Sequence, residues 1–187
     1  MSETTREAPV TLTAPGIRLR RWLLSDAPVL LAARQDPDIV RWSPNGSRAD
    51  PESVRDWLTR RSAGWLDDEL SFAVADATTD VVVAAVTLHH IRVDHSKAEV
   101  GYWTAPAARG RGFSATAVGV VTGWAFDALR LHRVELFHAV DNPGSCRVAG
   151  KAGFVLEGTM RASYRYGDGR LHDEHVHARL ATDPARR

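Results

Sequence analysis

The stretch PAARGRGFSATAVGVVTGWAF, from Pro106 to Phe126, places two glycines beside two arginines immediately before an apolar helical segment. Glycine lets the backbone approach a ligand closely, and the first turn of a helix presents N–H groups that have no partner within the helix. Arginine adds positive charge at the same place. This combination predicts a site for an anion, and a phosphate or pyrophosphate suits it best.

Composition sets the broad class of the protein. The chain has 187 residues, 44% of them hydrophobic, so we expect one domain over 1–187 with its core at about 17–180. The 24 basic and 23 acidic residues nearly cancel, which gives no reason to expect nucleic acid or a membrane as partner. The sequence offers neither an apolar run of membrane length nor a signal-peptide core, and Cys146 is its single cysteine. We therefore expect a soluble, cytoplasmic protein without an intrachain disulfide.

Hydrophobic periodicity divides the chain into alternating strands and helices, after a loose lead-in that ends before Ile17. Loop-forming residues occupy RWSPNGS, from Arg41 to Ser47. The expected strands cover residues 17–22, 70–76, 81–91, 97–104, 133–140, 154–166 and 172–180. The expected helices cover residues 26–36, 51–65, 114–129 and 142–153. This order predicts a mixed α/β (α+β) sheet flanked by helices.

Several ligands could occupy the glycine loop. A P-loop needs Lys-Ser/Thr after its last glycine, whereas Phe113 follows Gly112. A dinucleotide fingerprint fits the spacing from Gly110 to Ala115, but the loop after the strand is too long and the acidic residue in range, Glu135, begins the next strand. A solvated loop with turn-forming glycines is the remaining alternative to a phosphate site.

The stretch resembles the signature of the GNAT superfamily of acyl-CoA-dependent N-acetyltransferases, Gln/Arg-x-x-Gly-x-Gly/Ala between a central strand and a helix. Arg109 to Phe113 match it, and Ser114 replaces the final small residue. The segments AEVGYWTAP, RVELFHAVDNPGSCRVAGKAGF and EGTMR with YGDGRLHD resemble the branch named for ribosomal-protein N-terminal alanine and serine acetyltransferases. The likeness covers roughly residues 17–180. It implies the GNAT fold, a central and mostly antiparallel sheet in which one central strand pair splays apart.

The resemblance implies acetyl-CoA as co-substrate. The N–H groups of residues 110–115 would hold its pyrophosphate, and the free edge of the central strand would pair with the pantetheine amides. One strand N–H, near Trp103, would polarise the thioester carbonyl. Arg147 and Lys151 share a helix face that could serve the 3′-phosphate or could simply be solvated. The implied cofactor-binding residues are Tyr102, Trp103, Thr104, Arg109, Gly110, Arg111, Gly112, Phe113, Ser114, Ala115, Asn142, Ser145, Arg147 and Lys151.

The family's chemistry is direct attack of a neutral amine on the thioester in a ternary complex. Glu99, His138 and Tyr164 are candidates to take the proton of the amine, with Glu99 preferred, although each could also be structural. Many relatives protonate the leaving thiolate with a tyrosine, but Ala149 occupies that position here. The ribosomal-protein branch uses a serine that matches Ser145, and this serine also suits a helix start.

The acceptor is expected to be a primary amine, preferably a protein N-terminal α-amine, with a small amine such as an antibiotic or metabolite as the alternative. Trp42 and Asn45 belong to the segment that relatives use as a wall of the acceptor site. A domain that binds acyl-CoA as a sensor without catalysis is a third possibility. Sheet edges of this kind often pair, so a homodimer is possible.

We expect no metal. In HDEHVH, from His172 to His177, polar and apolar residues alternate as in a half-buried strand. Neighbouring His89 and His90 should point to opposite faces of their strand, so they should not ligate one ion together. Cys146 lacks an evident base, so we expect a small packed residue and no acyl-enzyme. The Arg18, Arg20 and Arg21 run is expected to be the solvated part of an edge strand.

Overall fold

The computed structural model describes residues 10–43, 49–63 and 68–184. None of the helices in these ranges is both long and apolar enough to cross a membrane. The strands are β1 (Leu12–Ala14), β2 (Ile17–Arg20), β3 (Leu70–Asp76), β4 (Val82–Arg92), β5 (Lys97–Thr104), β6 (Arg133–Ala139), β7 (Val155–Arg165) and β8 (Leu171–Leu180). The helices are α2 (Ala27–Gln35), α3 (Pro37–Arg41), α4 (Pro51–Ala63), α5 (Phe113–Ala128) and α6 (Pro143–Lys151), with short 3-10 turns at Leu24–Asp26, Val93–His95 and Pro106–Ala108.

The strands form one sheet in the order β1-β2-β3-β4-β5-β6-β8-β7. Every neighbouring pair is antiparallel except β5 and β6, which run parallel. The expected mixed, mostly antiparallel sheet is thereby confirmed. The prediction of a loose lead-in is wrong at Leu12–Ala14, because these residues pair with β2 and extend the sheet by one short strand.

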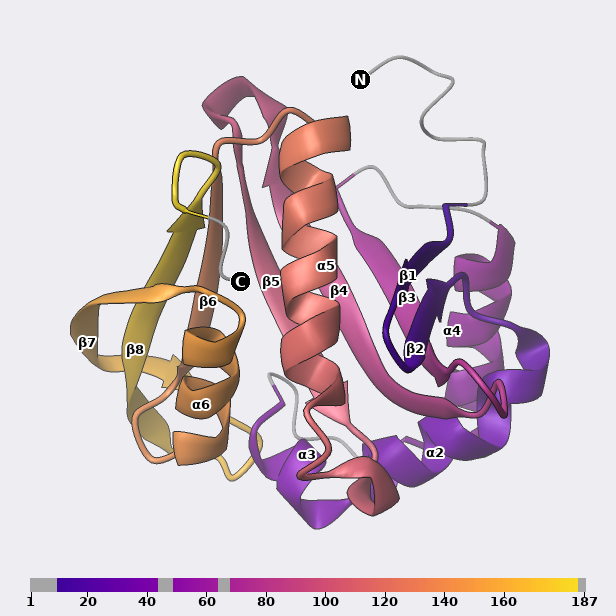
Figure 1. Cartoon of the computed structure of the whole chain (residues 1–187). Coiled ribbons are helices and arrows are strands. Elements are labelled where there is room, and N and C mark those ends of the chain that lie inside the picture. The colour runs from indigo at the N-terminus through magenta and orange to yellow at the C-terminus, as the bar shows by residue number, and fades with distance from the viewer. Residues whose placement is uncertain (1–9, 44–48, 64–67, 185–187) are drawn as a thin grey trace.

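Helices cover both faces of the sheet (Figure 1). On one face α5 lies over the central strands β4 and β5, and α6 lies over β6, burying the larger core cluster. On the other face α2 and α4 pack over β3 and β4 around Trp22, Leu30 and Leu58. Alternate residues of each strand therefore point to one core or the other, as a period of two requires.

The parallel strands β5 and β6 separate along their length. They are in register only at their starts, from Lys97 opposite Arg133 to Glu99 opposite Glu135. Beyond Glu99, β5 continues to Thr104 paired with β4, and β6 continues to Ala139 paired with β8. The far half of β5 therefore presents an unpaired edge toward β6, which confirms the splayed pair that the resemblance implied.

Acidic residues cap the starts of two of the helices that flank this sheet. Asp36 accepts a hydrogen bond from the N–H of Ile39 and starts α3, and Asp50 accepts one from the N–H of Ser53 in α4. The expected loop from Arg41 begins with a residue that is still helical. The predicted end of the next helix, at residue 65, lies outside the described residues.

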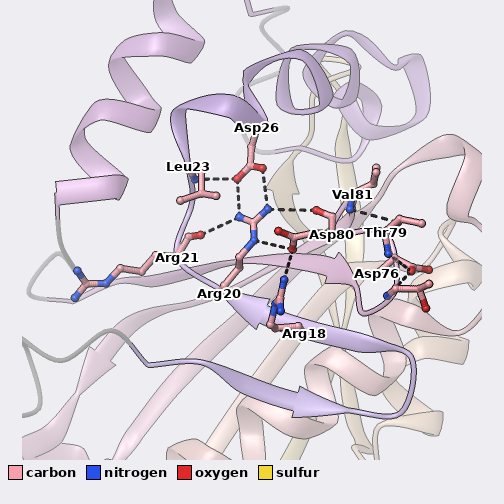
Figure 2. A network of polar contacts seen from close by, with 10 residues as sticks. Arg18, Arg20, Arg21, Leu23, Asp26, Asp76, Thr79, Asp80 and Val81 are labelled. Carbon is pink, nitrogen blue, oxygen red and sulfur yellow. Dashed lines mark hydrogen bonds and ion pairs between the residues drawn. The ribbon is translucent and has the colours of Figure 1, made fainter.

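The arginines of β2 are not the solvated face of an edge strand. β1 pairs with the outer side of β2, so β2 is not an edge strand. Arg20 is mostly buried, and its guanidinium pairs with both oxygens of Asp26 at 2.8 and 2.9 Å (Figure 2). Arg18 and Arg20 both reach Asp80 on the β3–β4 turn. The hydrogen bonds from Arg20 hold the start of α2 against the sheet.

Replacing Arg20 with glutamine should lower the free energy of unfolding by about 3 kcal/mol, because buried Asp26 would lose its bidentate partner. Arg18→Gln is the matched control. Its side chain is 41% exposed, so the change should cost less than about 1 kcal/mol. Urea unfolding followed by circular dichroism measures both variants. If both variants lose the same unfolding free energy, the buried Arg20–Asp26 pair contributes no more to stability than the exposed Arg18–Asp80 pair.

Candidate functional site

The glycine loop has the backbone that its composition predicts. Gly110 and Gly112 have φ values of +79° and +85°, and Gly112 is the N-cap of α5. A Cβ added at either glycine would meet no atom within 4 Å, so the space beside them is open. Ser114 and Ala115, in the first turn of α5, are buried. The helix start therefore has the free space and the unpaired N–H groups that an anion needs.

The two arginines of the loop contact acidic residues of other elements. The guanidinium of Arg109 pairs with Asp36 and Asp38, which ties the loop to the start of α3. Arg111 lies over the ring of Phe113 at 4.4 Å and 3.7 Å from a carboxylate oxygen of Asp76. Arg109 thus anchors the loop, and a role in binding phosphate stays a prediction for both arginines.

A tyrosine and a serine meet across the gap between β5 and β6. The hydroxyl of Tyr102 on β5 lies 2.9 Å from Oγ of Ser145 on α6. Burial raises the pKa of Tyr102 to about 12, so this hydroxyl keeps its proton near neutral pH. Asn142, the N-cap of α6, accepts a hydrogen bond from the N–H of Ser145 and fixes the backbone there. The sequence suggested both residues separately but gave no sign of their contact.

The backbone N–H groups of β5 alternate between the two sides of the strand. The N–H of Ala105 donates to the carbonyl of Val83, on the β4 side. Because donors alternate along a strand, the N–H of Trp103 also points toward β4. Those of Tyr102 and Thr104 then point into the gap. Thr104 is fixed further by a hydrogen bond between its hydroxyl and that of Ser114 in α5.

Glu99 lies at the point where β5 and β6 begin to separate, on the face opposite to α5 and α6. One of its carboxylate oxygens is 3.0 Å from Nδ1 of His90, and the other is 3.8 Å from Nδ1 of His89. Burial lowers the pKa of His89 despite the nearby carboxylate. Glu99 also lines a cavity of about 430 Å³. The other residues of its lining are Asp68, His90, Arg92, Lys97, Ala98 and Glu135.

The expectation that His89 and His90 point apart is wrong. Their Nδ1 atoms are 3.4 Å apart, and their ligand atoms lie within 4.8 Å of each other and of Glu99. The physical reason is a break in strand alternation, because His90 has a φ of +50° and the β4–β5 register shifts after His89. A β-bulge of this kind leaves no clear mark in the sequence.

An aromatic wall stands on the same face as Glu99, formed by α3 and the β7–β8 hairpin. The ring of Trp42 packs edge-on against Tyr166 and His172, with centroids 5.8 and 5.6 Å away. Behind them, buried Glu174 accepts hydrogen bonds from Tyr166 and Ser163 at 2.7 Å. Sequence reasoning identified Trp42 but missed Tyr166 and Glu174. The other predicted wall residue, Asn45, lies outside the described residues.

The three candidate bases do not lie together. Burial raises the pKa of Tyr164, and the charges of Glu174 and then Glu99 add to this, so Tyr164 lies on the same side of the sheet as these carboxylates. His138 follows Glu135, the register partner of Glu99, by three residues and so points to the opposite face, under α6. It is buried there, and desolvation lowers its pKa.

Arg147 and Lys151 are exposed on α6, one helical turn apart. They project from the same helix as Asn142 and Ser145. Their geometry is compatible with either expected role, the 3′-phosphate or a solvated face.

Comparison with known proteins agrees with this geometry. The family described as "Acetyltransferase (GNAT) domain" matches residues 17–155. Among curated proteins, Probable N-acetyltransferase YjcK of Bacillus subtilis is 36% identical over 63% of this chain and 65% of its own length. Spermidine N(1)-acetyltransferase of Vibrio cholerae is 32% identical over 56% of this chain and 60% of its own. The match thus spans slightly less than two thirds of each of these two relatives.

Solved structures show the same fold. Ribosomal-protein-S5-alanine acetyltransferase from Vibrio fischeri superposes with a TM-score of 0.78 at 24% identity, over 95% of this chain and all of that one. The family match covers the glycine loop, the splayed strands and α6, where the features described above are found. The chain belongs to the GNAT acetyltransferase family.

Proposed function

We propose that the protein transfers the acetyl group of acetyl-CoA to a primary amine, by direct attack within a ternary complex. The observation that carries the proposal is the gap between β5 and β6, bounded by the open glycine loop at one end and crossed by the Tyr102–Ser145 contact. An extended thioester arm fits an unpaired strand edge, because its amides can replace the missing strand partner.

The glycine loop would hold the pyrophosphate of coenzyme A. The N–H groups of residues 110–115 and the positive end of the dipole of α5 favour a doubly charged anion there. From this point the pantetheine arm would run along the edge of β5 toward Asn142. Arg147 and Lys151 are placed to meet the 3′-phosphate on the outer side of α6.

The gap also supplies a donor for the thioester oxygen. Tyr102 and Thr104, whose N–H groups point into the gap, replace neighbouring Trp103 as the candidates for this role. A fixed N–H polarises the carbonyl and stabilises the oxyanion of the tetrahedral intermediate, a contribution of about 3 kcal/mol in typical acyl-transfer enzymes.

The leaving thiolate would receive its proton from the Ser145 side of the gap. When the Tyr102 hydroxyl donates to Ser145 Oγ, the Ser145 proton is free to point toward sulfur. As the C–S bond breaks, Ser145 gives its proton to sulfur and recovers one from Tyr102, which is later reprotonated from solvent. A tyrosine from β5 would thus take the role of the helix tyrosine that Ala149 cannot provide.

The amine would approach from the opposite face, where Glu99 and the aromatic wall lie. Glu99 can accept a proton from an arriving ammonium group, whereas Tyr164 has a raised pKa and His138 lies under α6. An α-amine, with a pKa near ~8, is already partly neutral and needs less help than a lysine amine. We therefore favour a protein N-terminal α-amine as acceptor.

A small polyamine is the second candidate. The Vibrio cholerae relative is named for spermidine, and the acceptor side of this protein combines the carboxylate of Glu99 with aromatic rings. Carboxylates and aromatic faces both attract cations, and a polyamine carries several.

Replacing Glu99 with glutamine should slow turnover by about 10²-fold near neutral pH and move the rate optimum upward. The variant cannot accept the proton, so only amine that is already neutral can react, and its fraction rises with pH. Glu135→Gln is the matched control in the same cavity and should keep the wild-type pH profile. A profile unmoved by Glu99→Gln would assign the base to another group or to water.

An acceptor panel decides between the two acceptor classes. Acetylated product would be quantified with free-N-terminus peptides, lysine peptides with blocked N-termini, polyamines and aminoglycosides. Product with the free peptides alone supports the α-amine proposal. Product with small amines alone would reject it and leave acetyl transfer in place.

A further inference from the structure

Three histidines and the single cysteine meet beneath α6. They are His138 on β6, His175 and His177 on β8, and Cys146 on α6, and one ligand atom of each lies within 4.8 Å of all the others. His138 and His177 are buried, and the other two are half-buried. The strand register explains the meeting, because His138 is opposite His175 and Leu136 is opposite His177, which puts all three rings on the α6 face.

Two of the ring nitrogens in this cluster have no hydrogen-bond partner among the described residues. Nδ1 of His138 lies 2.8 Å from the carbonyl oxygen of Ala139, so it carries the proton and leaves Nε2 with a lone pair. That Nε2 is 3.1 Å from Nε2 of His177. Among the described residues, Nδ1 of His175 and Nδ1 of His177 are buried without a hydrogen-bond partner. Buried nitrogens of this kind call for an explanation, and a bound ion is one.

We propose that His138, His175, His177 and Cys146 form a tetrahedral Zn²⁺ site that ties α6 to β6 and β8. Three imidazoles and one thiolate are ligands that zinc prefers, and Zn–N and Zn–S bonds of about 2.0–2.3 Å put tetrahedral ligand atoms ~3.3–3.8 Å apart. The observed separations need only small side-chain adjustments to reach this geometry. The His138 contact with the Ala139 carbonyl is the outer hydrogen bond that metal-binding histidines usually make.

The ion would be structural, since four protein ligands leave no open position for substrate. Binding deprotonates Cys146, and the released proton passes to the buffer. Because Cys146 follows Ser145 directly, the ion would also fix the start of α6, which borders the gap. The second cluster, His89, His90 and Glu99, is more exposed and contains the candidate base, so it serves as the comparison site.

Cobalt spectroscopy tests the proposal without relying on activity. The full chain, free of added histidine tags and stripped of metal, would be titrated with Co²⁺ and then with Zn²⁺. We expect one Co²⁺ per chain, with intense tetrahedral d–d bands and a thiolate-to-cobalt band in the near ultraviolet, and loss of both when Zn²⁺ displaces Co²⁺. Absence of tetrahedral bands in the wild-type protein would overturn the proposal.

Variants locate the ion. Cys146→Ser should abolish the thiolate band, and His177→Gln should weaken Co²⁺ binding by on the order of 100-fold or more, since loss of an outer partner alone costs 10–100-fold. His90→Gln, in the comparison cluster, should leave the spectrum unchanged. A thiolate band that survives Cys146→Ser, or bands that vanish in His90→Gln, would reject the site. Circular dichroism without metal checks that each variant is folded.

Discussion

Replacing Gly112 with valine should remove measurable acetyl-CoA binding, a loss of at least 100-fold in affinity. Gly112 caps α5 with a φ of +85°, a conformation that a β-branched residue adopts only at a cost of about 1–3 kcal/mol. The added side chain would also occupy open space that we assign to the pyrophosphate. Isothermal titration calorimetry with acetyl-CoA measures the loss.

Two companion variants make this result specific. Gly119→Ala, in the body of α5 where an added Cβ meets nothing within 4 Å, should bind acetyl-CoA like the wild type. Gly112→Asn separates strain from blockage, because asparagine tolerates positive φ but still carries a side chain. If Gly112→Val binds with unchanged affinity, the glycine loop is not the phosphate site.

Replacing Ser145 with alanine should lower kcat by about 10²-fold while the affinity for acetyl-CoA stays nearly unchanged. The variant removes the hydroxyl that stands between Tyr102 and the leaving sulfur, and general-acid groups typically contribute at least this much. Tyr102→Phe should act in the same direction. Because the two hydroxyls act as one unit, the double variant should lose little more than Ser145→Ala alone.

The matched control is Ser53, at the start of α4. The N–H of Ser53 donates to the side chain of Asp50 as that of Ser145 does to Asn142, so both serines hold the third position after a capping residue. Ser53→Ala removes a comparable hydroxyl far from the gap and should leave kcat unchanged. If Ser145→Ala keeps the wild-type kcat, Ser145 has only a structural role at the start of α6.

The fold was predictable where local pattern decides it. The glycine loop, the apolar helix after it and the alternating strands each have a local sequence pattern that predicts them. The separation of β5 from β6 was predicted from the family resemblance. Contacts between distant elements were not predictable in this way. β1 makes β2 an interior strand, Arg20 pairs with Asp26 from the start of α2, and His90 turns because of a bulge. Neither β1, with three residues, nor the bulge has a distinctive sequence pattern.

The same distinction applies to the candidate site. Glu99 and Ser145 were identified by resemblance, each on its own element. The contact of Tyr102 with Ser145 and the meeting of His138 with Cys146 depend on how α6 packs over the sheet. Tyr102 and Ser145 are 43 positions apart in the chain, and His138 and Cys146 lie on different elements, so no periodic pattern in the sequence links either pair.

Amine-dependent release of coenzyme A tests the central claim most directly. Free thiol and acetylated amine would be measured in the same reaction, with and without the best acceptor from the panel. Direct transfer in the gap predicts one thiol for each amine acetylated and no release above background without the amine. Acetyl-CoA that binds at the glycine loop but releases no thiol with any amine would contradict the account and point to an acyl-CoA sensor.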